Sequence, residues 1–360
     1  MVDTKKVKVA IVGAGNISNS RHIPALKKNT EVEIVGALSN KLDRAKKTAE
    51  NHGIPHYAQI SDSYKKSLKE LKAMSWLRDV DAVVIGAPPH LHYELVKTFL
   101  ELGKNVLVEK PMMMNKQECD EMIALAKQKN KIFYVMHNFQ YARKMVKLNE
   151  IIESKRFGEI ESIIESQLTN HDRRLPEWYN DLPMGLFYDE AAHFMYLLEK
   201  HGGALKIDNS YAVYDKDPTQ NTPVTLTVNA QAGKVPVTML LNFHAPVCEW
   251  HYIVNFKKKI FIYDFFKDIL IELPTDNEHL AVDILKNSIR YTWQYWSQFV
   301  ANGFRMVTGN LLYGHDTVLR SFVRASSGAE PVDARLTADN GQRNVIAINE
   351  IINKANKRII

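Results

Sequence analysis

The sequence predicts an α/β protein in which a doubly wound parallel sheet precedes a second α/β domain with an open, mostly antiparallel sheet. Two observations lead to this prediction. Short apolar runs alternate with amphipathic helical stretches over the first part of the chain, as in βαβ units. From about Phe139 the runs become longer and alternate between apolar and polar residues, as in a sheet with one covered face. We therefore expect domains at residues 1–138 and 139–360, with the final helix as a candidate to pack back on the first domain.

Five apolar runs are the expected strands of the first domain, and each ends near glycine, proline or a polar residue. They are KVKVAIVGAG (6–15), EVEIVGALS (31–39), DVDAVVIGAPP (79–89), NVLVEKP (105–111) and KIFYVMHN (131–138). Helical stretches lie between them, and Gly53 and Gly103 stand where two of these helices should end. Asn115, with Glu118 three residues later, predicts a capped start for the helix that follows.

Five further runs are the expected strands of the second domain. They are EIESIIESQL (159–168), PVTLTVNAQAG (223–233), PVTMLLNFHA (236–245), EWHYIVNF (249–256) and KIFIYDF (259–265). From about Leu280 the pattern becomes helical, and the last helix should run through NGQRNVIAINEIINKANK (340–357). The segment 289–307 carries aromatic residues at helical spacing, which we interpret as core or as a contact between subunits.

Charge and cysteine content narrow the function classes. The 360 residues carry a formal net charge of +6, but the lysines are scattered, so we expect no nucleic-acid partner. Cys119 and Cys248 are too few for a disulfide framework or a cysteine-based metal site. We expect no signal peptide, because MVDTKK leads directly into a strand, and no apolar run approaches the length of a membrane span. We therefore expect a cytoplasmic protein with no membrane partner.

The first strand ends in a glycine-rich turn. Gly13, Gly15 and Ser18 form a G-x-G-x-x-S pattern between a strand and a helix, and Asn16 and Ile17 complete the turn. Such glycines let backbone N–H groups approach a pyrophosphate at the helix N-terminus. The pattern predicts a dinucleotide-binding Rossmann domain, although a tight βα turn without a ligand can also use glycines.

The end of the second strand bears on which dinucleotide binds. An NAD-binding domain usually has an acidic residue there for the ribose 2′-hydroxyl. This chain has Ser39, Asn40 and Lys41 instead, followed by Arg44. These side chains would accommodate a 2′-phosphate, so the sequence favours NADP over NAD. The alternative is a simple strand end and helix cap, with Asn40 as the capping residue.

The run NVLVEKP places two charges and a proline where a buried strand ends. Pro111 disfavours the helical conformation for Lys110, which should therefore be extended at the edge where ligands bind in doubly wound sheets. Lys110 is placed to bond the reacting oxygen and the nicotinamide ribose. The alternative for Glu109 and Lys110 is a surface salt bridge of little energetic weight.

Several segments together resemble one family. AIVGAGNIS, HIPAL, VVIGAPPHLHYEL, VLVEKP and FYDEAAHFMYLL match blocks of the Gfo/Idh/MocA family in order, and AEPVDARLTADNGQRNVIAINEII resembles its closing segment. The resemblance covers nearly the whole chain. It implies an NAD(P)-dependent oxidoreductase that moves a hydride between nicotinamide and a carbinol or carbonyl carbon of a sugar, cyclitol or nucleotide sugar.

The resemblance also implies roles for particular residues. Lys110 would be the lysine of the family's E-K-P element, and Asp189 and His193 its D-x-x-x-H pair. Residues at i and i+4 share a helix face, and a histidine has a suitable pKa for exchanging a hydroxyl proton; an isolated pair of this kind would instead be a helix-surface contact. The cofactor-side positions that carry over are Pro88, His92, Glu109 and Asn138.

The substrate side is less well defined. Arg173 and Arg174 are candidates to bind a carboxylate or phosphate, and Trp178 to stack on a sugar or base, unless this loop merely packs beside the pocket. The chain departs from the family pattern at Gln140, Ala191 and Tyr196, which leaves the substrate open.

Other activities and assemblies remain open at this point. A dihydrodiol- or imine-type oxidoreductase and a non-catalytic, cofactor-sensing regulator are the alternatives to a sugar or polyol enzyme. We expect no metal, because a cofactor and an acid–base pair suffice for hydride transfer. We also expect a homodimer or homotetramer.

Overall fold

The computed structural model describes residues 6–61, 64–173, 175–216, 221–275, 278–311 and 313–360. The chain divides into two compact units. The first contains residues 1–138 and 314–346, and the second contains residues 139–313 and 347–360. Residues 314–346, which the sequence analysis assigned to the second domain, therefore group with the first unit.

The first unit contains a six-stranded parallel sheet in the order β3-β2-β1-β4-β5-β6. This is the order of a doubly wound sheet, and it confirms the predicted fold class for this part of the chain. The strands are β1 (Val7–Val12), β2 (Val32–Ser39), β3 (His56–Gln59), β4 (Ala82–Ile85), β5 (Asn105–Val108) and β6 (Phe133–Val135). Most of their residues are buried, as expected for parallel strands covered on both faces.

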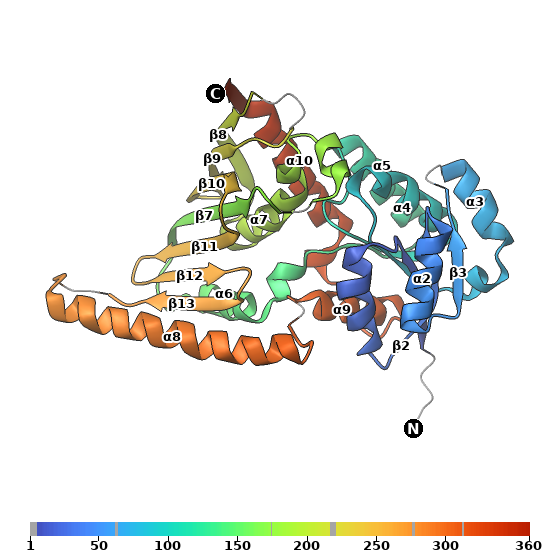
Figure 1. The fold of residues 1–360 in the computed structure, drawn as a ribbon, viewed down its shortest axis with the longest axis horizontal. Coiled ribbons are helices and arrows are strands. Elements are labelled where there is room, and N and C mark those ends of the chain that lie inside the picture. Colours follow the sequence, from blue (N-terminus) through green and yellow to red (C-terminus); the bar gives the residue numbers. More distant parts are fainter. Residues whose placement is uncertain (1–5, 62–63, 174, 217–220, 276–277, 312) are drawn as a thin grey trace. The chain divides into compact units, whose positions relative to one another are not determined.

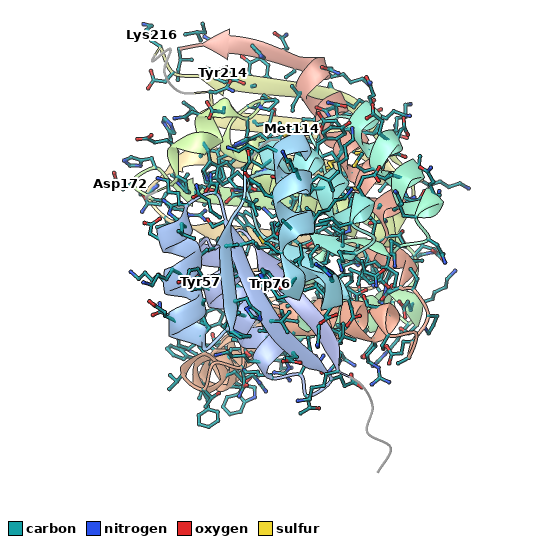
Figure 2. All side chains as sticks on the ribbon, turned by 90° about the vertical axis from the view of Figure 1, so that its right-hand side faces the viewer. Tyr57, Trp76, Met114, Asp172, Tyr214 and Lys216 are labelled. Carbon is teal, nitrogen blue, oxygen red and sulfur yellow. The ribbon has the colours of Figure 1, made fainter. Side chains whose placement is uncertain are left out.

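A close contact explains one glycine within β2. A Cβ atom on Gly36 would lie 2.3 Å from a ring carbon of Trp76, so only glycine leaves room for the indole. Trp76 also stacks on His56 of β3, with ring centroids 5.2 Å apart. Trp76 and the exposed Tyr57 of β3 are labelled in Figure 2. The indole thus covers part of the outer strands.

Helices connect the strands of the first unit. They are α1 (Ile23–Lys27), α2 (Leu42–His52), α3 (Tyr64–Ala73), α4 (His92–Glu101) and α5 (Lys116–Gln128), while α9 (His315–Ser326) belongs to the same unit but comes from the later part of the chain. Gly53 ends α2 in the left-handed conformation, as predicted. Asn115 caps α5 by accepting the Glu118 N–H at 2.9 Å, and Glu118 in turn accepts the Met114 N–H at 3.0 Å. The predicted cap is therefore confirmed.

The second unit is built on an eight-stranded sheet in the order β13-β12-β11-β7-β10-β9-β8-β14. Among the described strands, the β7–β10 and β8–β14 pairs are parallel and the other pairs are antiparallel, so the sheet is mostly antiparallel, as predicted. The strands are β7 (Ile160–Asn170), β8 (Leu205–Tyr214), β9 (Thr225–Ala232), β10 (Val235–Ala245), β11 (Glu249–Phe256), β12 (Ile260–Asp264), β13 (Ile269–Leu273) and β14 (Ala355–Ile359). Alternate residues along β7 to β11 are buried, which leaves the other face open.

The helices α6 (Arg143–Glu153), α7 (Leu186–Gly202) and α8 (Ala281–Val307) pack on this sheet. Residues Leu186 to Leu198 of α7 are all buried, and the helix packs against β7, β8 and β9. α8 lies along the edge strand β13 (Figure 1). Its large apolar residues are mostly exposed, so the interpretation of segment 289–307 as core is wrong, and a subunit contact stays a prediction.

The end of the chain differs from the prediction. The last helix, α10 (Ala338–Lys354), stops earlier than expected, and residues 355–359 form β14, which pairs with β8. Residues of α10 up to Ile346 belong to the first unit and the rest belong to the second. Among the residues that the structure describes, no helix is both long and apolar enough to cross a membrane.

Candidate functional site

The glycine-rich turn lies at the switch point of the parallel sheet, where the strand order reverses between β1 and β4. Gly13 has φ +95°, and a Cβ atom on it would lie 2.6 Å from the carbonyl oxygen of Gly86, which follows β4. Ser18 fixes the turn by donating its hydroxyl to the Gly13 carbonyl at 2.6 Å. Ligands bind outside the carboxyl ends of strands at such a point. Gly15 and Asn16 are exposed there, and Ile17 is half-buried.

The turn after β2 presents polar and basic groups. Ser39 is buried and its hydroxyl accepts the Lys41 N–H at 3.4 Å, while Asn40, Lys41 and Arg44 are exposed. Lys41, and not Asn40, is the N-cap of α2, and it makes no side-chain capping bond. The alternative of Asn40 as the helix cap is therefore wrong, and the side chains of Asn40, Lys41 and Arg44 are exposed around the start of α2.

A buried group that the sequence analysis missed lies beside the E-K-P element. Glu109 accepts a hydrogen bond from His22 at 2.8 Å, and the His22 ring is 6.1 Å from that of His315. Burial alone would raise the pKa of Glu109, but the hydrogen bond and charge of His22, followed by the charge of His315, lower it to about 2. Glu109 is therefore an ionised, buried carboxylate, and the surface salt-bridge alternative is wrong for it.

Lys110 and Pro111 follow Glu109 at the end of β5. Lys110 is half-buried, its N–H donates to the Glu109 carboxylate at 3.2 Å, and the Lys110–Pro111 peptide is cis. His92, at the start of α4, contacts the Pro111 carbonyl at 2.8 Å and the Ala87 carbonyl at 2.9 Å. Its imidazole thus joins the loop after β4, which contains Pro88, to the loop that contains Lys110.

The last strand of this sheet leads to buried polar residues. Burial lowers the pKa of His137 to about 4, so this imidazole is neutral. Its Nε2 lies 3.2 Å from the Asn344 side-chain amide of α10. The next residue, Asn138, is also buried.

In the second unit, α7 carries Asp189, Glu190 and His193 on its buried length. His193 Nδ1 lies 2.9 Å from the Tyr196 hydroxyl, which accepts the Phe139 N–H at 3.1 Å. The Tyr196 oxygen can also accept the Nδ1–H of a neutral imidazole, and Nε2 is then the ring nitrogen that can take a proton. The Phe139 ring meets the His193 ring edge-on, with centroids 4.7 Å apart. The centroid of the Trp250 ring lies 5.9 Å from that of His193.

The loop before α7 binds to the acidic residues of that helix. Arg173 forms an ion pair with Glu190 at 2.9 Å, and Gln167 of β7 also donates to Glu190. The Tyr179 hydroxyl bonds Asp189, and burial, together with the charge of Asp189, raises the Tyr179 pKa, so the phenol stays protonated. Trp178 stacks on Tyr179 at 3.9 Å. Arg174 lies outside the described residues.

Among the residues that the structure describes, two groups of histidine and carboxylate side chains are close enough together to suit a metal ion. One is His22, Glu109 and His315, and the other is Glu249, His251 and Asp264. In the second group, the Lys267 ammonium contacts Glu249 at 2.6 Å and Asp264 at 2.7 Å, so these carboxylates already have a cation.

Known proteins are similar to this chain in sequence and in fold. The family model described as "Oxidoreductase family, NAD-binding Rossmann fold" matches residues 7–137. Residues 7–137 thus resemble the NAD-binding domain of the Gfo/Idh/MocA family. The resemblance inferred from the sequence is thereby confirmed.

The relatives of this chain are distant in sequence. An uncharacterized oxidoreductase of Synechocystis sp. is 26% identical over 237 residues, which are 62% of this chain and 61% of the relative. The match thus spans less than two thirds of that relative's length.

Two solved structures share the fold over nearly the whole chain. KijD10, a 3-ketoreductase from Actinomadura kijaniata in complex with NADP and TDP-benzene, has a TM-score of 0.70 and 17% identity over 99% of this chain and 100% of its own. GenD2 from gentamicin A biosynthesis, in complex with NAD, has a TM-score of 0.74 and 17% identity over 97% of this chain and 94% of its own. At this identity the likeness concerns the fold, and it confirms the predicted two-part α/β architecture.

Proposed function

We propose that the protein catalyses reversible hydride transfer between a nicotinamide cofactor and a carbinol or carbonyl carbon of a sugar, cyclitol or nucleotide sugar. The observation that carries this proposal is the arrangement on α7. Buried His193 has its Nδ1 beside the Tyr196 hydroxyl, and Asp189 lies about one helical turn before it. An imidazole fixed in one tautomer is suited to exchanging a proton with a hydroxyl group.

The residues around the glycine-rich turn fit a dinucleotide. The space that a Cβ on Gly13 would need is taken by Gly86, so the backbone of the turn stays close to the sheet, and Gly15 and Asn16 are exposed. We propose that N–H groups from Gly15 to Ile17 hold the pyrophosphate. Pro88 and Asn138 would line the nicotinamide half, while His92 and Glu109 position the loops there through the bonds described above.

A bound nicotinamide supplies or accepts the hydride. In the oxidative direction the carbinol C–H bond breaks with its electron pair, the C=O bond forms, and His193 takes the hydroxyl proton. Lys110 would donate a hydrogen bond to the same oxygen, and Asp189, itself bonded by Tyr179, would orient the substrate. In the reductive direction the proton returns from His193.

We propose NADP as the preferred cofactor. Lys41 and Arg44 are exposed at the end of β2, where a ribose 2′-phosphate would lie, and no acidic residue stands at positions 39 to 41. Of the two solved structures, KijD10 carries NADP and GenD2 carries NAD. Titration of nicotinamide fluorescence should give a lower Kd for NADPH than for NADH, and the reverse order would contradict this choice.

The substrate class follows from the groups beside α7. Trp178, stacked on Tyr179, offers an aromatic face to a sugar ring. Arg173 neutralises buried Glu190 and keeps a partly exposed guanidinium, which is suited to a phosphate or carboxylate of the substrate. Both features support a nucleotide sugar within the wider class.

A substrate panel tests the proposed activity. Sugars, cyclitols and nucleotide sugars are offered with NADP and NAD, and nicotinamide absorbance is followed in both directions. For an accepted substrate, His193→Ala should lower kcat about 100-fold or more, the usual contribution of a general acid–base group. His90→Ala, which alters an exposed histidine after β4, is the matched control and should leave kcat unchanged. Cofactor binding without turnover of any panel member would contradict the proposal.

A double-mutant cycle tests the role of Tyr196. Tyr196→Phe should lower kcat about tenfold with little change in KM, because His193 loses the group that fixes its tautomer. In the His193→Ala background the same change should have no further effect on kcat. Independent, additive effects would show that Tyr196 does not act through His193.

A further inference from the structure

α8 packs against the sheet with its polar face. Gln298 exchanges two hydrogen bonds with the backbone of Leu270 in β13, at 3.1 and 2.9 Å. Gln294 does the same with Glu272, both at 3.0 Å, and Asn302 donates to the carbonyls that precede β13. These amides satisfy the free backbone groups of an edge strand. Because the polar face is turned inward, the apolar face of the helix is turned outward.

The outward face is a continuous row of apolar side chains, here called the outer stripe. It consists of Val282, Leu285, Ile289, Trp293, Trp296, Val300, Phe304 and Val307, which are between 56% and 88% exposed. An amphipathic helix of a globular protein normally turns such a row toward the core. The outer stripe is therefore a surface that lacks its partner within this chain's described residues.

The outer stripe is large enough for a protein interface. The helix has 27 residues, which corresponds to a length of about 40 Å. Trp293, Trp296 and Phe304 alone expose roughly 400 Å², given about 150–250 Å² for a buried aromatic side chain. Monomeric proteins seldom expose contiguous apolar patches of more than a few hundred Å², and a stable interface needs about 800 Å² per partner. The outer stripe with its apolar neighbours on α8 approaches this area.

The spacing along the outer stripe reads the same in both directions. Successive members are separated by 3, 4, 4, 3, 4, 4 and 3 positions. Two such helices, antiparallel and related by a two-fold axis between Trp293 and Trp296, would therefore match member to member. The facing pairs are Val282 with Val307, Leu285 with Phe304, Ile289 with Val300, and Trp293 with Trp296.

We propose that the outer stripe of α8 binds the outer stripe of a second copy of this chain, antiparallel and about a two-fold axis. Such an isologous contact requires a self-complementary surface, which the palindromic spacing provides. The stripe contains no charged residue, so pairing it with itself buries no unpaired charge.

The cations of α8 argue against a lipid surface as the occupant. Helices that lie on membranes direct basic side chains toward the lipid headgroups. Of its three cations, Arg290 bonds Glu272 of β13 at 3.1 Å and Arg305 bonds Asn302 at 2.9 Å, so these two are engaged on the sheet side of the helix, while Lys286 is exposed and adds a single positive charge. A second apolar stripe fits this face better.

Exchange of one facing pair for opposite charges tests the proposal and its register. Ile289→Lys and Val300→Glu each place a charge in the pair that Ile289 and Val300 form. In sedimentation velocity at tens of micromolar protein, wild type should have at least twice the 41.2 kDa mass of one chain. Each single variant should have half the wild-type mass. Equimolar mixing of the two variants, or the double variant Ile289→Lys/Val300→Glu, should restore the wild-type mass, because lysine then faces glutamate across the antiparallel pair.

A control variant and the possible outcomes of sedimentation decide whether the outer stripe pairs two chains. Leu240→Glu alters an exposed leucine on the open face of the sheet and should leave the mass unchanged. Far-UV circular dichroism verifies that all variants are folded. A wild type of one-chain mass, single variants with unchanged mass, or a mixture that stays dissociated would each overturn the proposal. Binding of the one-chain form to phosphatidylserine-containing vesicles, lost in Ile289→Lys, would assign the stripe to a membrane instead.

Discussion

At the residue scale, two buried glutamates have opposite surroundings. Glu109 has His22 within hydrogen-bond distance, whereas neither carboxylate oxygen of Glu165 on β7 has a hydrogen-bond partner among the described residues. Their pKa values accordingly move in opposite directions: that of Glu109 falls to about 2, and burial raises that of Glu165 well above its usual value. The two residues should therefore give opposite dependences of stability on pH.

For Glu109, the folded-state pKa lies below the unfolded value near 4.5. Its contribution to stability is thus present above pH 4.5 and is lost as the pH falls toward 2. Between pH 6 and pH 3, wild type should lose about 2 kcal/mol more unfolding free energy than Glu109→Gln, which cannot titrate. Urea unfolding at both pH values measures this, with Glu31→Gln, at a half-buried position, as the control. Equal losses for wild type and Glu109→Gln would contradict the ionised state of Glu109.

For Glu165, the folded-state pKa lies above the unfolded value. Its protonated form favours the folded state below about pH 4.5, and this contribution is lost as the pH rises toward the folded-state pKa. Relative to Glu165→Gln, wild type should lose up to about 1.4 kcal/mol of unfolding free energy per pH unit in that range. Glu161→Gln, at an exposed position of the same strand, should show no such trend. A stability difference independent of pH would mean that Glu165 is already ionised in the folded protein.

The sequence predicted those site residues whose neighbours in the site are also close to them along the chain. The glycine turn and the pair Asp189 and His193 follow local spacing, so pattern and resemblance suffice to find them. His22 and His315 were missed because their significance depends on Glu109, which is distant in sequence and joins them only after folding. Tyr196 was noted only as a departure from the family pattern, yet its hydroxyl holds His193.

At the scale of elements, apolar runs and turn residues predicted β1, β2, β4 to β7 and β9 to β12, but they missed β3, β8 and β13. They failed at the chain end, because the residues of β14 are mostly exposed and polar and resemble a helix surface. They also failed for the orientation of α8. An amphipathic pattern indicates that a helix has an apolar face, but it does not indicate that the polar face packs against an edge strand.

The amide contacts of α8 should protect β13. Gln298→Ala removes both bonds to Leu270, so the Leu270 amide should exchange its hydrogen faster, in line with a loss of about 1–3 kcal/mol for unpaired buried backbone groups. Hydrogen exchange of the peptide that covers 267–275, followed by mass spectrometry, measures the change. Ser288→Ala, which removes a bond within α8 only, is the control. Unchanged exchange at Leu270 in Gln298→Ala would show that the amide contact does not protect the strand.

At the scale of the whole molecule, the first unit is assembled from two separate parts of the chain. The rings of Phe322 in α9 and Tyr134 in β6 are in contact, with centroids 5.8 Å apart. The Tyr134 hydroxyl also accepts the Asp333 N–H at 2.5 Å. A Cβ on Gly341 would lie 2.7 Å from Val135, which shows how closely α10 packs on β6. The sequence did not predict this grouping because both parts of the C-terminal region are helical, and helical patterns do not specify which sheet they cover.

Residues 314–346 should therefore unfold together with the parallel sheet. In hydrogen exchange of the full chain at increasing urea, peptides from α9 should lose protection at the same concentration as peptides from β5 and β6. The expected reason is that β6 loses its cover when α9 detaches. Loss of protection in step with β7 and β10 instead would assign the segment to the second unit's cooperative group.

The cover over β13 also has a consequence for synthesis of the chain. An open edge strand can pair with another molecule and seed aggregation. Because α8 follows β13 directly in the chain, a ribosome adding about 5–20 residues per second completes the helix within a few seconds. The nascent sheet is thus exposed at this edge only briefly, and substitutions that detach α8 should lower the yield of protein from cells before they alter any catalytic step.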